Sequence, residues 1–188
     1  KNFLGAGDDF VGMLSNGTSG DANIWDFIKP DRYPKGDHQK KELIGKDLAE
    51  KISQFIHNII WETDTSLSSK FKDITLGVRK PTDKELATAR DIVAKTDYRL
   101  IHPDTAALVN IYAREQVLLN EYPDTITFPV QALKIGSITI GALGGEFFAE
   151  TGLALKKANH SGKYFTITMA NGYCGYIPPA HEIEKGGY

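Results

Sequence analysis

Three short segments of the sequence combine glycines with side chains that could bind a metal or take part in catalysis. Glu146 follows two glycines, which let the backbone turn sharply. Tyr173 and Tyr176 are each preceded by a glycine, so a tight loop could bring them close to a ligand. The third segment, residues 16–21, reads Asn-Gly-Thr-Ser-Gly-Asp. Because Cys174 is the single cysteine, a metal here would need histidine, carboxylate or tyrosine ligands.

Each segment also has a structural interpretation. Glu146 could complement the dipole of a helix that starts at that residue, and tyrosines in a loop after a strand often serve in packing. The 16–21 loop could bind an anion through its backbone amides, but it lacks the lysine of a phosphate-binding loop. No HExxH or comparable metal spacing occurs among the histidines. They are His38, His57, His102, His160 and His181.

The amino-terminal part of the chain predicts elements of both kinds. An apolar run at 10–14 predicts a buried strand that ends in the 16–21 loop, and residues 71–78 predict a second strand. A capping-box pattern at Thr82 predicts a helix to about Ala94, and His102-Pro103-Asp104 predicts the start of another that ends at Pro123. A longer helix at 39–60 is predicted from an apolar stripe. Its members are Leu48, Ile52, Phe55 and Ile59.

The carboxyl-terminal part predicts how the segments come together. Strands at 125–135 and 138–143 are separated by Gly136-Ser137, which is typical of a hairpin. A helix at 146–158 and a strand at 164–169 follow, so the second hairpin strand and the last strand should be parallel neighbours. The fold class is therefore α/β, a mixed β-sheet flanked by helices. In such sheets ligands bind at the carboxyl ends of the strands, which is where we expect the active site.

Composition limits the classes of protein and partner. With 188 residues, of which 41% are hydrophobic, the chain fits one soluble domain or a large piece of one. A net charge of −2 implies neither a nucleic acid nor an anionic membrane as a partner. No apolar run reaches the roughly 18 to 20 residues that cross a bilayer. Residues 1–5 are not typical of a signal peptide, so we expect any export signal upstream of Lys1.

The sequence resembles the neutral/alkaline, non-lysosomal ceramidase family, and particularly its shorter bacterial members, over nearly the whole chain. The resemblance implies that residues 1–188 are the carboxyl-terminal half of a zinc hydrolase catalytic domain. The chain would then be a fragment whose partner is the amino-terminal half of the same domain. Five segments carry the resemblance. They are 15–21 (SNGTSGD), 111–115 (IYARE), 144–147 (GGEF), 170–176 (ANGYCGY) and 186–188 (GGY).

The resemblance assigns roles to three residues. In the family, two histidines, a glutamate and a tyrosine hold a zinc ion. The glutamate of the Gly-Glu-Phe corner matches Glu146, and the ligand tyrosine, second of a Tyr-x-x-Tyr pair, matches Tyr176. A tyrosine twelve positions further on, which donates a hydrogen bond to the developing oxyanion, matches Tyr188. Both histidine ligands belong to the amino-terminal half, so this chain alone should not hold catalytic zinc.

One departure from the family concerns the nucleophile. Ceramidases have Gly-Asp-Val-Ser-Pro-Asn, with the serine beside the metal, whereas Asn23 occupies the serine's place here. An amide is not a nucleophile, so a zinc-activated water attacks, or Ser19 takes the role, or the substrate differs from ceramide. We favour water, because zinc lowers the pKa of its bound water toward about 7. Asp21 either orders the loop or supports a metal ligand.

The function implied by the resemblance is hydrolysis of an amide bond in ceramide or a related N-acyl lipid. Such a substrate is compatible with peripheral membrane contact, and family members are usually exported, which implies a periplasmic or extracellular location. Two alternatives stay open. One is a zinc hydrolase that acts on another ester or amide. The other is a degenerate family member that binds a lipid or a glycan without turnover.

Overall fold

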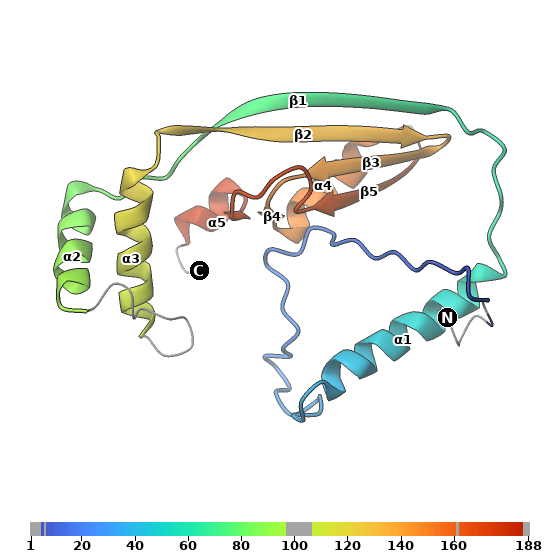
Figure 1. Cartoon of the computed structure of the whole chain (residues 1–188), viewed down its shortest axis with the longest axis horizontal. Helices are drawn as coiled ribbons and strands as arrows, with labels where there is room; N and C mark the ends of the chain where they lie inside the picture. Colours follow the sequence, from blue (N-terminus) through green and yellow to red (C-terminus); the bar gives the residue numbers. More distant parts are fainter. Residues whose placement is uncertain (1–4, 6, 97–106, 161, 186–188) are drawn as a thin grey trace. The chain divides into compact units, whose positions relative to one another are not determined.

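Four strands form a mixed sheet in the order β1-β2-β3-β5 (Figure 1), in which β1 spans Leu67–Gly77. Two short strands, β4 and β6, form a second sheet. This computed structural model describes residues 5, 7–96, 107–160 and 162–185. With five helices, from α1 (Gln39–Ile56) to α5 (Ala180–Glu184), in these residues, the fold is α/β, as the sequence predicts. Two compact units divide the chain, Lys1–Lys72 with Pro129–Tyr188, and Asp73–Phe128. No helix within the described residues has the length and apolarity to span a membrane.

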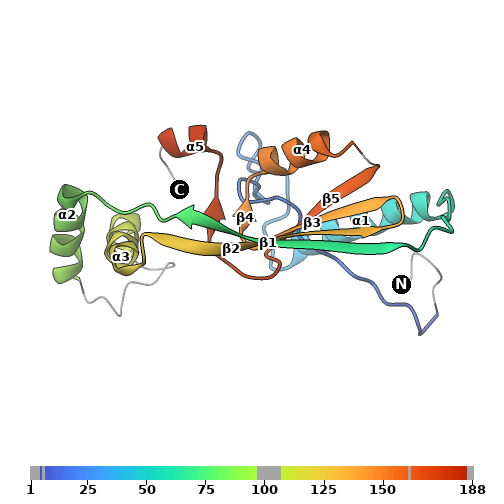
Figure 2. The same ribbon diagram turned by 90° about the horizontal axis from the view of Figure 1, so that it is seen from above.

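The first unit is organised around β3 (Ile138–Leu143). It pairs antiparallel with β2 (Thr125–Ile135) from Ile135 opposite Ile138 to Val130 opposite Leu143, so the predicted hairpin is confirmed. On its other side β3 pairs in parallel with β5 (Lys163–Thr168), as the strand-helix-strand pattern predicts. The connecting helix α4 (Ala149–Ala158) lies against β5 (Figure 2).

The interior of this unit lies at the carboxyl ends of β3 and β5. Ala142 and Leu143 are buried on β3, and Thr166 and Thr168 are buried on β5. The Thr166 hydroxyl donates a hydrogen bond to the Tyr164 hydroxyl oxygen over 3.0 Å, which pairs two polar groups inside the sheet. These contacts give the loops that follow both strands a fixed starting point.

Two predictions for the amino-terminal part are wrong. Residues 10–14 form no strand, and Val11 and Met13 are 77% and 93% exposed. Helix α1 ends at Ile56 rather than near residue 60, and none of its residues is buried. Its predicted apolar stripe stays exposed, since Phe55 has 70% of its surface accessible. An apolar pattern shows which residues tend to be buried, but burial also needs a packing surface, and Val11, Met13 and Phe55 stay exposed within the described residues.

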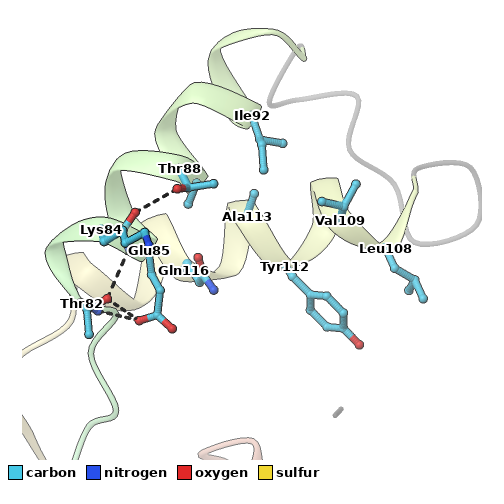
Figure 3. Close-up of a pocket in the computed structure, with 11 residues that line it drawn as sticks. Thr82, Lys84, Glu85, Thr88, Ile92, Leu108, Val109, Tyr112, Ala113 and Gln116 are labelled. Carbon is cyan, nitrogen blue, oxygen red and sulfur yellow. Dashed lines mark hydrogen bonds between the residues drawn. The ribbon is translucent and has the colours of Figure 1, made fainter. Parts of the chain in front are cut away.

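The second unit contains a pair of packed helices, α2 (Asp83–Ala94) and α3 (Leu108–Glu121). Ala89 and Ala113 are 1% and 3% exposed. The capping box at Thr82 is confirmed, because its hydroxyl accepts a hydrogen bond from the Glu85 amide while the Glu85 carboxylate accepts one from the Thr82 amide (Figure 3). A groove of about 710 Å³ runs along the two helices. The predicted helix start at 102–104 lies outside the described residues.

Candidate functional site

Two turns meet where β3 and β5 end. After Leu143 the chain passes through Gly144 and Gly145, and after β5 it returns so that the Ala170 amide donates to the Leu143 carbonyl over 3.0 Å. The Cys174 amide donates to the Gly144 carbonyl, also over 3.0 Å. A Cβ on Gly145 would lie 3.0 Å from the sulfur of Cys174, so glycine permits this close approach. Both turns lie at strand carboxyl ends, where the sequence predicts the site.

Glu146 lies in a short strand and not in a helix. The predicted helix start at Glu146 is wrong, because α4 begins at Ala149 and β4 (Glu146–Phe147) precedes it. The Glu146 amide donates to the Gly175 carbonyl over 2.9 Å and so belongs to a β-ladder. In the first turn of a helix, the same amide would have no hydrogen-bond partner within the helix. The ladder is parallel and pairs Glu146 with Tyr176, the first residue of β6 (Tyr176–Ile177). Two residues thirty positions apart in sequence are therefore neighbours.

The Glu146 carboxylate has a hydrogen-bond donor that sequence reasoning missed. The hydroxyl of Tyr173 donates to Glu146 Oε1 over 2.7 Å. Glu146 is half-buried, whereas Tyr173 and Tyr176 keep 64% and 40% of their surface exposed. The sequence signal is present in the Tyr-x-x-Tyr pair, but the hydrogen bond in the structure is what identifies Tyr173 as a donor to the carboxylate, while Tyr176 is the ladder partner of Glu146.

The 16–21 loop is attached to the end of β5. The Thr168 amide donates to the Asn16 carbonyl over 2.9 Å, and the Thr168 hydroxyl donates to the Gly17 carbonyl over 2.7 Å. This loop follows no strand, contrary to the prediction, but it reaches the same sheet edge through these contacts.

The end of the loop is attached to β4 and α4. The Gly20 amide donates to the Phe147 carbonyl over 2.8 Å, and Asp21 Oδ1 accepts a hydrogen bond from the Ala149 amide over 2.7 Å. Phe148, the residue before α4, makes no side-chain hydrogen bond that caps the helix. Asp21, 128 positions from Ala149 in sequence, instead accepts a hydrogen bond from one of the free amides at the helix start. Its negative charge also complements the helix dipole.

The remaining predicted site residues are placed differently. Ser19 is exposed, and its carbonyl accepts from the Ala22 amide over 3.0 Å in a turn. Asn23 Oδ1 accepts from the Trp25 amide over 3.1 Å, so the amide that stands in the serine's place folds its own loop. Tyr188 lies outside the described residues.

Gly20→Ala is expected to destabilise the protein by about 1 to 3 kcal/mol, because a small-to-large change in a filled space forces the backbone to shift. A Cβ at Gly20 would overlap the carbonyl oxygen of Glu146 and lie 3.0 Å from its carbonyl carbon. Thermal unfolding measures the effect. Gly45→Ala is the control, since its Cβ would meet nothing within 4 Å and alanine favours the helix α1. A Gly20→Ala protein as stable as the wild type would contradict the close packing of loop and strand.

Metal-binding groups other than Glu146 and Tyr176 are sparse around this edge. Within the described part of the chain, no three His, Cys, Asp or Glu side chains come close enough to share a metal ion. Burial raises the pKa of the Cys174 thiol. Glu146 and Tyr176, the ligands that the resemblance implies, are neighbours in the β4–β6 ladder.

The chain is similar to known proteins in structure and not in sequence. No model of a known protein family matches the chain, and no curated protein matches it. Among solved structures it is similar to the neutral ceramidase from Pseudomonas aeruginosa, with a TM-score of 0.48 and 16% sequence identity. The similarity covers 86% of this chain and 30% of that one, so the chain spans less than a third of the ceramidase's length.

Proposed function

We propose that this chain supplies two ligands to the zinc site of a hydrolase that cleaves an amide bond in ceramide or a related N-acyl lipid. The observation that carries the proposal is the parallel pairing of β4 with β6, which sets Glu146 directly beside Tyr176. These are the two residues that resemble the metal ligands of the neutral ceramidases, and their pairing follows from backbone hydrogen bonds that do not depend on a metal.

The residues fit a zinc ion in their chemistry. Zinc accepts carboxylate oxygen ligands at about 2.0 to 2.2 Å and is usually four-coordinate. Glu146 is half-buried, and one of its carboxylate oxygens already accepts the Tyr173 hydrogen bond. Two histidines from the amino-terminal half would complete the set in this proposal. When bound, zinc would polarise the scissile carbonyl and lower the pKa of water toward about 7.

The other residues of the site have roles in binding and orientation. Tyr188 donates a hydrogen bond to the oxyanion that develops in the transition state. Asp21 holds the start of α4 against the 16–21 loop through the Ala149 amide. Asn23 is not a nucleophile, and its side-chain oxygen is bonded to the Trp25 amide, so water is the attacking group in this proposal. Ser19, exposed on the same loop, is the alternative nucleophile.

The proposed surroundings follow from the substrate. A lipid amide is a small molecule that resides at a membrane surface, so peripheral membrane contact and a periplasmic or extracellular location are part of the proposal. Nucleic acid is not among the proposed partners, because a net charge of −2 offers no excess of positive charge.

The metal provides the test. A protein that contains both halves of the domain should bind about one zinc, lose amidase activity to a chelator and regain it with zinc. Residues 1–188 alone should bind zinc weakly, because zinc sites need at least three protein ligands and this chain supplies two. Elemental analysis measures the amount of zinc bound, and competition with a chelator measures the zinc affinity. Tight, stoichiometric zinc on residues 1–188 alone would contradict the proposed ligand set.

A second candidate function is hydrolysis of a different ester or amide by the same site. Asn23 favours this second candidate, because it stands where the family has a serine. Its side-chain oxygen accepts a hydrogen bond from the Trp25 amide and so stabilises a turn in the loop. Parallel assays of ceramide, shorter N-acyl amides and acyl esters separate the two. Zinc binding with turnover of substrates other than ceramide supports this second candidate. Binding of a lipid or a glycan without turnover supports a degenerate family member that is not an enzyme.

A further inference from the structure

We propose that Tyr173 is a positioning residue that holds the Glu146 carboxylate in the orientation in which it binds metal, an inference that rests on the proposed function. The Tyr173 hydroxyl donates to Glu146 Oε1 over 2.7 Å. A hydrogen bond from a hydroxyl to a carboxylate is assisted by the charge and is stronger than one between neutral groups. It occupies one oxygen of the carboxylate and leaves the other for a metal.

The backbone of Glu146 is fixed, but its side chain needs a separate constraint. The Glu146 amide is bonded to the Gly175 carbonyl, and β4 is in register with β6, so the Cα position is set. Three further torsions separate that Cα from the carboxylate oxygens, and each torsion has several staggered minima. The Tyr173 hydroxyl is the hydrogen-bond donor that the structure records on this carboxylate, and it selects among those orientations.

The loop that carries Tyr173 is itself held in place. Gly172 and Gly175 have φ angles of +154° and +81°, values that residues other than glycine rarely adopt. Between them, the Cys174 amide donates to the Gly144 carbonyl over 3.0 Å. Tyr173 keeps 64% of its surface exposed, so burial contributes little to its position. The hydrogen bond to Glu146 is a contact that phenylalanine at this position could not make.

Hydrogen bonds to metal ligands typically account for about 10- to 100-fold in metal affinity. Tyr173→Phe removes the hydroxyl and keeps the ring. In the protein with both halves of the domain, we expect the variant to bind zinc about 10- to 100-fold more weakly, measured by competition with a chelator. The unfolding temperature of the metal-free variant should fall by no more than about 4 °C, because a single hydrogen bond of an exposed residue is lost and the ring is kept. Tyr122→Phe is the control, since Tyr122 is 56% exposed at the end of α3, in the other unit, and should leave zinc affinity unchanged.

The outcomes separate this inference from the function on which it rests. A wild-type protein that binds no zinc overturns the proposed function, and the role of Tyr173 with it. A second outcome is that the wild type binds zinc and Tyr173→Phe weakens zinc affinity by less than about fivefold. That loss is below the range for residues that hydrogen-bond to metal ligands, so only the inference about Tyr173 fails. A fall of more than about 4 °C in the unfolding temperature of the metal-free variant would assign Tyr173 a structural role and also overturn the inference. A larger loss of zinc affinity, with unfolding inside that range, supports it.

Discussion

Glu146→Gln should remove most of the bound zinc and most of the activity from the protein with both halves of the domain, while its fold stays intact. Partners that only support a ligand are worth about 10- to 100-fold in metal affinity, so a direct ligand should cost at least about 100-fold. The fold should survive because the ladder contact of this residue is made by its backbone amide with Gly175. The Tyr173 hydroxyl can also donate to the amide oxygen of glutamine. Zinc content, activity on an N-acyl lipid and thermal unfolding are the measurements.

Glu150→Gln is the matched control for charge at this end of α4. Glu150 lies exposed in the first turn of the helix, 3.3 Å from the imidazole of His181, and should retain zinc and activity when changed. If Glu146→Gln kept its zinc and its activity, Glu146 would have a structural role in the loop and the proposed ligand set would be wrong.

Tyr188→Phe should reduce turnover by about 100- to 1,000-fold, because an oxyanion donor stabilises charge that develops only in the transition state. Ser19→Ala should change activity by less than about tenfold, since the exposed hydroxyl could lose at most a local hydrogen bond worth roughly 1 kcal/mol and the carbonyl that accepts from Ala22 is kept. The contrast follows from water as the attacking group. Both variants are compared on an N-acyl substrate after their zinc content has been measured, because loss of the metal would imitate loss of the donor.

Two results would reverse this assignment. Collapse of activity in Ser19→Ala with zinc retained would show that the loop has its own nucleophile, as would an acyl group trapped on Ser19 and detected by mass spectrometry. Tyr188→Phe with unchanged turnover would remove the oxyanion role from Tyr188, which the twelve-residue spacing from Tyr176 alone supports.

Local patterns in the sequence predicted the elements that depend on local chemistry. The capping box at Thr82 fixed the start of α2, and the Gly136-Ser137 turn fixed the hairpin of β2 and β3. The parallel pairing of β3 with β5 followed from the order of strand, helix and strand. These features need only neighbouring residues or a general rule of chain connection.

Features that depend on distant partners could not be read from the sequence. The helix predicted from Glu146 starts at Ala149, because the Glu146 amide pairs with Gly175 and Asp21 caps the helix from a distant loop. The apolar run at 10–14 looked like a strand, but a strand needs another strand beside it, and the described residues provide none there. The hydrogen bond from Tyr173 to Glu146 likewise joins residues 27 positions apart, and spacing along the chain does not reveal it.

The contact between Asp21 and Ala149 also sets an order of events during synthesis. The two residues are separated by 128 positions, and a ribosome adds about 5 to 20 residues per second. After Asp21 is made, about 6 to 26 seconds pass before Ala149 exists, and Thr168, which anchors Asn16, is made later still. The 16–21 segment therefore leaves the ribosome without its hydrogen-bond partners. This edge of the sheet can assemble only after translation has passed Thr168.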